Sequence, residues 1–323
     1  MSSLAKTATP SFLLARRAAE AAQSYARQAL SEATLRAYRS DWAQFCGFCA
    51  AAGLASLPAL PETVASYLAG MAFTHGRATL RRRLVAIGQV HRLSGHAWSA
   101  AHPTIRNTLR GILRRHGVPA RQAAALGTAE LKRLVATCDG DLAGLRDRAL
   151  LLVGYAGALR RAELVGLERE HIRITRDGME ITIARAKTDQ EGQGATIGIA
   201  RGRQRETCPV RALEAWLDRS DCKFGPVFRA VTMWGAVEHR ALHPDSVRQI
   251  LRRRAGLAGL APEAGQRLSP HGLRAGFVTE AYRAGARDEA IMDHTRHRDL
   301  KTMRGYVRRA KLISDSPVKL LGL

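Results

Sequence analysis

Four short segments in the second half of the chain carry side chains that can bind an anion or take part in proton transfer. A guanidinium presents a planar fork of N–H donors that fits phosphate oxygens two at a time. A phenol, with a pKa of about 10, becomes a useful nucleophile only when a base removes its proton. The segments are Ala158-Leu159-Arg160-Arg161-Ala162-Glu163-Leu164, the single Lys187, Ser269-Pro270-His271-Gly272-Leu273-Arg274, and His297 with Tyr306 nine residues after it.

Each segment alone also has an ordinary structural explanation. An arginine at a helix start is usually a surface ion-pair partner, and a lone lysine in a turn is usually solvated. His271 alone fits a hydrogen-bonded core histidine, and Tyr306 alone fits a core or rim aromatic residue. The inference therefore depends on the order and spacing of all four segments.

Local sequence predicts how these residues are positioned. Ser269 is expected to cap a helix whose first residue is Pro270, which places His271 and Arg274 on one face of the first turn. Arg160 lies at another helix start. Lys187 begins a polar turn, KTDQEGQG, between two strands.

The elements around these segments are predicted to be mostly helical with a small antiparallel β-sheet. We expect helices at 129–138, capped by Thr128, and at 145–155. A hairpin over 172–183 that turns at Asp177-Gly178 and a third strand over 196–199 follow, and helix resumes from Pro209.

The charge of the chain favours a polyanionic partner. Lys and Arg number 51 against 28 Asp and Glu, a net charge of +23, and 44 of the cations are Arg. Residues 1–125 and 126–323 carry +12 and +11, so the excess is not a basic tail. A GC-rich genome explains Arg over Lys but not the shortage of acidic residues. We therefore expect nucleic acid rather than a membrane surface, because no dominant basic helix has an apolar aromatic face.

The first part of the chain is predicted to form a four-helix lobe with arginine-rich surfaces. Apolar residues recur at helical spacing from Ser31, after Pro61, over 80–90 and after Pro103. A solvated face is the ordinary reading of one arginine run, but two runs in one small lobe favour contact with a DNA backbone. The candidates are Arg77, Arg81, Arg82, Arg83, Arg106, Arg110 and Arg114.

Several classes of protein are disfavoured. The longest apolar run, Ala149 to Leu159, is too short to span a bilayer, and no secretory signal is evident, so we expect a cytoplasmic, nucleoid-associated protein. Cys46 and Cys49 form a lone C-x-x-C pair that we interpret as small buried residues of a helix rather than a metal site. Aromatic residues make up only 5%, which disfavours an RNA-binding sheet.

Taken together, the four segments resemble the tyrosine recombinase (phage integrase) family of site-specific DNA recombinases, in its simple two-domain Cre-like and Xer-like form. The resemblance covers residues from about 25 to the end. It rests on the L-R-x-x-E-L box, the strand-turn lysine, H-x-x-R, and the last His and Tyr. It implies a segment 1–24 of poor order, a helical core-binding domain at 25–117, a linker at 118–127 and a catalytic domain at 128–323.

The resemblance also implies roles for the site residues. Arg160 and Arg274 would clamp the scissile phosphate, and Tyr306 would form a 3′-phosphotyrosyl link. His271 would accept the phenolic proton, and Lys187 would protonate the 5′-oxygen that leaves. Two further residues would support the site: His297 by hydrogen-bonding the phosphate, and Glu163 by orienting Arg160.

The family implies double-stranded DNA as the partner, a homotetramer on paired sites, a monomer or dimer off DNA, and neither metal nor cofactor. Its C-terminal segment commonly docks on a neighbouring protomer, which we expect of residues 314–323. Two alternatives are a catalytically inactive DNA-binding protein of the same fold and a type IB topoisomerase-like relaxing enzyme.

One position departs from the family pattern. The family often has Gly before the last His, where this chain has Arg296, whose side chain would either hold phosphate or crowd His297. His294 and Arg161 are the nearest rivals for His297 and Arg160, and Tyr155 and Tyr282 are the rival tyrosines.

Overall fold

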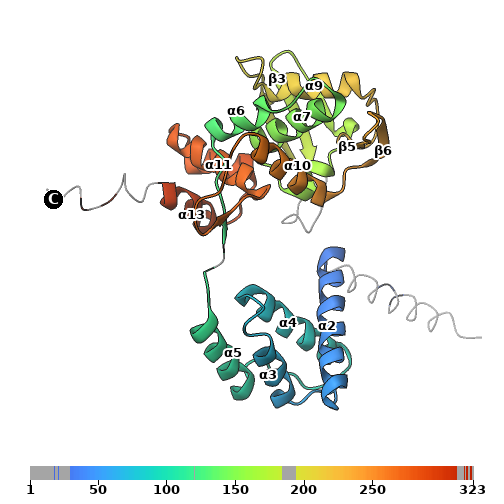
Figure 1. Ribbon diagram of the computed structural model, residues 1–323, viewed down its shortest axis with the longest axis vertical. Helices are drawn as coiled ribbons and strands as arrows, with labels where there is room; N and C mark the ends of the chain where they lie inside the picture. Colours follow the sequence, from blue (N-terminus) through green and yellow to red (C-terminus); the bar gives the residue numbers. More distant parts are fainter. Residues whose placement is uncertain are drawn as a thin grey trace, which may run out of the picture. The chain divides into compact units, whose positions relative to one another are not determined.

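The computed structural model describes residues 30–119, 121–183 and 194–310, together with the single positions 18, 21, 316, 318 and 321. The chain divides into two compact units, residues 1–120 and 121–323 (Figure 1). Lys187 lies outside the described residues, as does most of 1–24 and of 314–323.

The first unit contains the four expected helices. They are α2 (Glu32–Ala52), α3 (Pro61–Gly70), α4 (Arg77–Leu93) and α5 (Pro103–His116). Ser31 Oγ accepts a hydrogen bond from the N–H of Thr34 and begins α2, while Gly53, at φ 65°, ends it. In Figure 1, α2 packs along α4 and α3 along α5, around a core that includes Phe45, Cys49 and Leu68.

The prediction that Arg83 lies on the DNA-facing surface of this lobe is wrong. Arg83 is three residues after Leu80 and four before Ile87, so it lies on the apolar stripe of α4, and it is only 5% exposed. Its guanidinium donates to the hydroxyl of Tyr67 at 2.9 Å and lies 3.6 Å from the carboxylate of Asp41. Arg83 is therefore a core residue of this lobe.

Of the remaining candidates, Arg82 is half exposed and donates two hydrogen bonds to Asp41, at 2.7 and 2.9 Å. The other five are exposed in the structure, and their contact with DNA stays a prediction. They are Arg77, Arg81, Arg106, Arg110 and Arg114.

The second unit is mainly helical with small sheets. Its helices are α6 (Thr128–Ala136), α7 (Leu142–Ala156), α8 (Arg161–Val165), the 3₁₀ turn η1 (Arg169–His171), α9 (Pro209–Arg219), α10 (Pro244–Leu257), α11 (His271–Arg283), α12 (Asp288–Thr295) and α13 (Leu300–Ala310). Its strands are β1 (Gln122–Ala123), β2 (Ile172–Ile174), β3 (Gly178–Ile183), β4 (Ala195–Ala200), β5 (Arg229–Val231), β6 (Val237–Ala241) and β7 (Gln266–Arg267).

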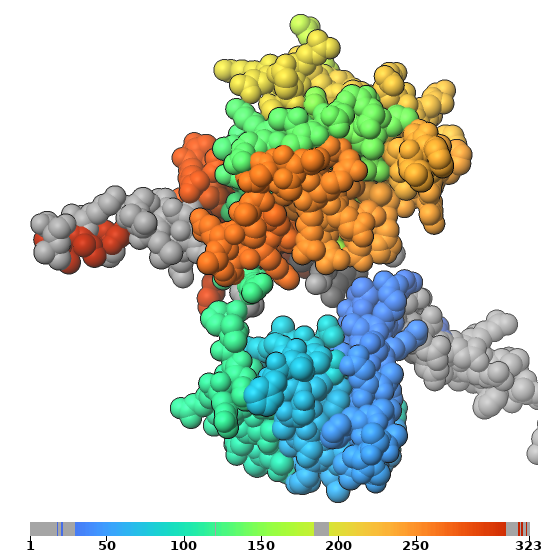
Figure 2. Space-filling model, in the orientation of Figure 1, coloured from blue at the N-terminus to red at the C-terminus, as the bar shows by residue number. Residues whose placement is uncertain are grey.

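The predicted antiparallel sheet is confirmed. Its order is β2-β3-β4, with Ile172 opposite Ile181 and Ile181 opposite Ile197. These isoleucines are buried against α7 and α9, because alternate side chains of a strand face the same side. Figure 2 shows the surface of this unit, where the orange α10–α11 region adjoins the green α6–α7 region. Among the described residues, no helix is long and apolar enough to cross a membrane.

Several local features differ from the prediction. The stretch after Pro209 contains a second hairpin, β5-β6, besides the expected helices. The helix α6 begins at Thr128, so its cap position is Gly127, whose N–H donates to the carboxylate of Glu130. The predicted cap by Ser269 is wrong, because its Oγ has no hydrogen-bond partner and only its carbonyl accepts, from the N–H of Gly272.

The segment predicted as the end of the linker packs on the second unit. Strand β1 pairs in parallel with β7, and the chain then crosses α11, where the N–H of Leu126 donates to the carbonyl of Gly272. A Cβ at Gly276 would lie 1.7 Å from the carbonyl oxygen of Leu126. The two glycines of α11 thus let this segment lie directly on the helix that begins with His271 and Arg274.

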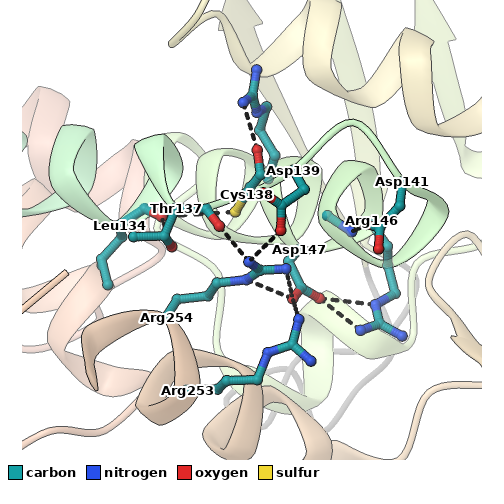
Figure 3. A network of polar contacts seen from close by, with 11 residues as sticks. Leu134, Thr137, Cys138, Asp139, Asp141, Arg146, Asp147, Arg253 and Arg254 are labelled. Carbon is teal, nitrogen blue, oxygen red and sulfur yellow. Dashed lines mark hydrogen bonds and ion pairs between the residues drawn. The ribbon is translucent and has the colours of Figure 1, made fainter. Parts of the chain in front are cut away.

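A buried carboxylate ties three helices of this unit together (Figure 3). Asp147 on α7 is fully buried, and its Oδ1 accepts two hydrogen bonds from Arg146, at 3.0 and 2.7 Å. Its Oδ2 lies 2.9 and 2.8 Å from two nitrogens of Arg254 on α10, which is 1% exposed and also donates to the carbonyl of Thr137 after α6. The network holds α6, α7 and α10 in one arrangement.

Removing the charge of Asp147 should strongly destabilise the second unit. Asp147→Asn leaves the buried Arg146 without its counter-charge and leaves Arg254 only the exposed Asp139, 3.9 Å away, and we expect the free energy of unfolding to fall by about 3–5 kcal/mol. Urea denaturation of the full chain measures this. The matched control is Glu180→Gln, which breaks the exposed pair with Arg173 and should leave the urea midpoint nearly unchanged. Equal effects of the two substitutions would contradict the account.

Candidate active site

The first turn of α11 and the helix α13 bring an imidazole and a phenol together. Nε2 of His271 lies 2.6 Å from the hydroxyl of Tyr306, a hydrogen bond between residues 35 positions apart. The two helices are held by a small apolar cluster that includes Val278, Met303 and Val307. In the tautomer with its proton on Nδ1, the His271 ring is placed to accept the phenolic proton.

Electrostatics keep that imidazole neutral. The pKa of His271 lies below the ordinary value of 6.5, first because the ring is partly desolvated and then because it faces Arg274 and Arg160. At neutral pH the ring is therefore a proton acceptor. The edge of His271 remains open to solvent, so a substrate can reach it.

Arg274 is buried near His271 and Tyr306 and is held in place by two backbone carbonyls. It is 1% exposed, and its guanidinium donates to the carbonyl of Ala158 at 2.7 Å and to that of Thr295. Burial, followed by the nearby charge of Arg160, lowers the pKa of Arg274 to about 10, so it stays charged at neutral pH. Ala158 adopts a left-handed conformation, at φ 46°, which non-glycine residues rarely do. The fold therefore accepts strain next to this guanidinium.

Arg160 precedes α8 and is anchored by Glu163. The carboxylate of Glu163 accepts from the N–H of Arg160 at 2.9 Å and from its guanidinium at 2.6 Å. Burial would raise the pKa of Glu163, but the backbone hydrogen bond and the charges of Arg296 and Arg160 outweigh burial and lower it. Glu163 is thus ionised, and it orients Arg160.

His297 is a second imidazole close to the phenol. Its ring centroid is 6.1 Å from that of Tyr306, and its Nδ1 lies 2.6 Å from the hydroxyl of Thr295. Burial, with the charges of Arg274 and Arg160, lowers the pKa of His297 to about 4. The neutral ring can therefore offer a hydrogen bond to an anion.

The rival residues point elsewhere. Nε2 of His294 lies 2.7 Å from the carbonyl of Ala156, and its ring stacks on Phe277. Arg161 pairs with Asp245 at the surface, at 2.7 Å. The hydroxyl of Tyr155 lies 3.3 Å from that of Thr128. The arrangement thus favours Arg160, His297 and Tyr306 over their neighbours in sequence.

Arg296 is the site residue whose place sequence reasoning left open. It ends α12 in the left-handed conformation, at φ 57°, and its guanidinium lies 2.9 Å from Glu163. Its guanidinium is therefore paired with a carboxylate. Charge alone could have suggested a carboxylate partner, since Glu163 and Asp299 are the two acidic residues within the four motif segments.

The assembled site can bind one anion and activate one phenol. Two guanidiniums and two neutral imidazoles converge around Tyr306, which suits a phosphate diester under attack by oxygen. Among the described residues, no group of three or more His, Cys, Asp or Glu could hold a metal ion. Lys187 lies outside the described residues, so its place in the site stays a prediction.

Comparison with known proteins identifies the family. The model of the phage integrase family matches residues 124–312, which contain every candidate catalytic residue named above. The chain belongs to the phage integrase family. It is 34% identical over 287 residues to an integrase/recombinase XerD homolog of Selenomonas ruminantium, covering 88% of this chain and 83% of that protein.

Further members agree with this assignment. The tyrosine recombinase XerC of Rhodospirillum centenum is 29% identical over 307 residues, covering 90% of this chain and 82% of that protein. Lambda integrase bound to DNA shares the fold, with a TM-score of 0.61 at 15% identity over 91% of this chain and 95% of that one. The XerH site-specific recombinase gives a TM-score of 0.58 at 17% identity, over 81% and 71%. The predicted fold class and family are confirmed.

Proposed function

We propose that this protein is a site-specific DNA recombinase that cuts and rejoins strands through a 3′-phosphotyrosyl intermediate at Tyr306. The observation that carries the proposal is the 2.6 Å contact between His271 and Tyr306, next to the guanidiniums of Arg160 and Arg274. A catalytically inactive DNA-binding protein would have no need to keep these groups together.

In the proposed cleavage step, the oxygen of Tyr306 attacks phosphorus as its proton passes to His271. The bond from phosphorus to the 5′-oxygen breaks, and that oxygen takes a proton, a role that we assign to Lys187 from the family resemblance. Arg160, Arg274 and His297 stabilise the charge that gathers on the non-bridging oxygens. Rejoining reverses these transfers with the 5′-hydroxyl of another strand, so the ester bond is exchanged without consumption of ATP.

Recombination requires two DNA sites and more than one active site. We therefore propose that the protein acts as a homotetramer on paired duplex sites, as the family resemblance implies. The exposed arginines of α4 and α5 and the net charge of +23 support binding along a DNA backbone. A type IB topoisomerase-like enzyme would share the chemistry but need no pair of sites.

The test begins with DNA sites selected by the protein from a randomised library. A nicked duplex carrying such a site loses a short 5′-hydroxyl strand on cleavage, which traps the covalent complex. We expect an adduct that survives boiling in detergent and forms equally in EDTA. Joining of two selected sites, but not of unselected duplexes, would separate a recombinase from a relaxing enzyme. Absence of any adduct would refute the proposal.

The fall of the cleavage rate at low pH, its acid limb, should reflect the protonation of His271. Because the pKa of His271 is lowered, the base is already neutral at pH 7, so we expect a rate that is flat above pH 7. The rate should fall as the pH drops through this lowered pKa, below 6.5. Single-turnover cleavage from pH 5 to 8 measures the profile.

The variant His271→Gln should cleave about 10²- to 10⁴-fold more slowly and lose this acid limb. His294→Gln is the control and should keep the limb, because His294 faces the carbonyl of Ala156. An unchanged acid limb in His271→Gln would assign the base elsewhere.

A further inference from the structure

The turn between α12 and α13 connects the parts of the site that lie far apart in sequence. The carbonyl of Thr295 accepts from Arg274, and the hydroxyl of Thr295 lies 2.6 Å from Nδ1 of His297. Between them, Arg296 reaches back to Glu163, which holds Arg160. Thr295 and Arg296 thus contact both guanidiniums of the clamp, Thr295 directly and Arg296 through one carboxylate, and His297 is bonded to Thr295.

Arg296 occupies a conformation that costs energy. At φ 57° an L-residue with a Cβ is strained relative to its usual conformations, whereas glycine is not. Its side chain is also costly to bury, since only 9% is exposed. Arginine at this position therefore carries two energetic costs, the backbone strain and the burial of its charge. The contact with Glu163 compensates for them.

The negative charge of Glu163 weakens the attraction of the site for an anion. Glu163 is 3% exposed and bonded to Arg160, so its negative charge opposes the attraction of Arg160 for a phosphate. Arg296 brings a second positive charge to the same carboxylate, 2.9 Å from Oε2. The three groups together keep a net charge of +1, which equals that of Arg160 alone.

Geometry gives Arg296 a second effect. Oε1 of Glu163 accepts a hydrogen bond from the guanidinium of Arg160. Oε2 accepts one from the backbone N–H of Arg160 and one from the guanidinium of Arg296. Because both oxygens are occupied, the carboxylate is held in one orientation. The carboxylate in turn fixes the orientation of the Arg160 guanidinium. We propose that Arg296 is a positioning residue for cleavage, which acts through Glu163 to orient Arg160 and to preserve its positive charge toward the scissile phosphate.

This inference rests on the proposed function, and it differs from direct phosphate binding in what it predicts. Arg296→Gly removes the guanidinium and relieves the strain, so the protein should fold. We expect single-turnover cleavage at saturating DNA to slow by roughly 10- to 100-fold, with the Kd for DNA changed by less than about threefold. Arg296→Lys keeps a charge without the planar fork and should recover part of the rate.

The decisive experiment repeats Arg296→Gly in a Glu163→Gln background. Without the carboxylate charge there is nothing for Arg296 to offset, so we expect the second substitution to slow cleavage by less than about threefold. An equal loss in both backgrounds would show that Arg296 acts independently of Glu163, and would overturn the inference. So would wild-type cleavage by Arg296→Gly, or a lowered unfolding midpoint of that variant that accounts for its loss.

The wild-type adduct on the nicked duplex serves as the reference for all variants. If the wild-type protein forms no adduct, the proposed function fails. If it forms one and the coupling between Arg296 and Glu163 is absent, only the positioning role fails.

Discussion

Tyr306→Phe should bind its DNA site and form no covalent complex. The substitution removes one oxygen and keeps the ring in contact with His271 and His297, so we expect the fold and the DNA surface to be retained. Without a nucleophile, we expect strand cleavage to fall by at least about 10⁴-fold. Gel shift measures binding, and the nicked duplex measures cleavage.

The matched control is Tyr282→Phe. Tyr282 lies near the end of α11, eleven positions after His271, and packs against the apolar cluster that includes Val278. This variant should form the adduct at the wild-type rate. A protein–DNA adduct in Tyr306→Phe, or its loss in Tyr282→Phe, would contradict the assignment of the nucleophile.

Arg274→Lys should lose far more rate than affinity. A lysine keeps one charge but cannot bridge the carbonyls of Ala158 and Thr295 while it faces a phosphate. Because its contact with the phosphate strengthens as charge develops in the transition state, we expect cleavage to fall by about 10³-fold with the Kd for DNA changed by less than about tenfold.

Arg161→Ala is the control for the loss of an arginine next to the site. Arg161 is exposed and pairs with Asp245, so its removal should change the cleavage rate by less than about threefold. If Arg274→Lys instead weakened binding and left the rate at saturation unchanged, Arg274 would contribute to ground-state binding only.

Patterns that depend on neighbours in sequence were predictable. Ser31 and Gly53 lie at the two ends of α2, and Pro61 and Pro103 begin α3 and α5, as expected. The hairpin of β2 and β3 also forms, but its turn lies one residue earlier than the expected Asp177-Gly178, because Gly178 already belongs to β3. Caps, prolines and short turns act through backbone groups within a few residues, so local sequence contains most of their physics.

Features that depend on distant partners were not predictable. Arg83 is buried because Asp41, Tyr67 and Gln44 converge on it from two other helices. Arg296 turns toward Glu163 across 133 residues of sequence. Helical spacing places Arg83 on the apolar stripe, but only the partners explain why a guanidinium is stable there.

The most direct test of the account locates the covalent bond. The adduct trapped on a nicked duplex would be digested with protease and nuclease, and the modified peptide identified by mass spectrometry. We expect the nucleotide remnant on Tyr306, linked through a 3′-phosphate. A remnant on Tyr155, Tyr282 or any other residue, or a 5′-phosphate linkage, would contradict the central claim.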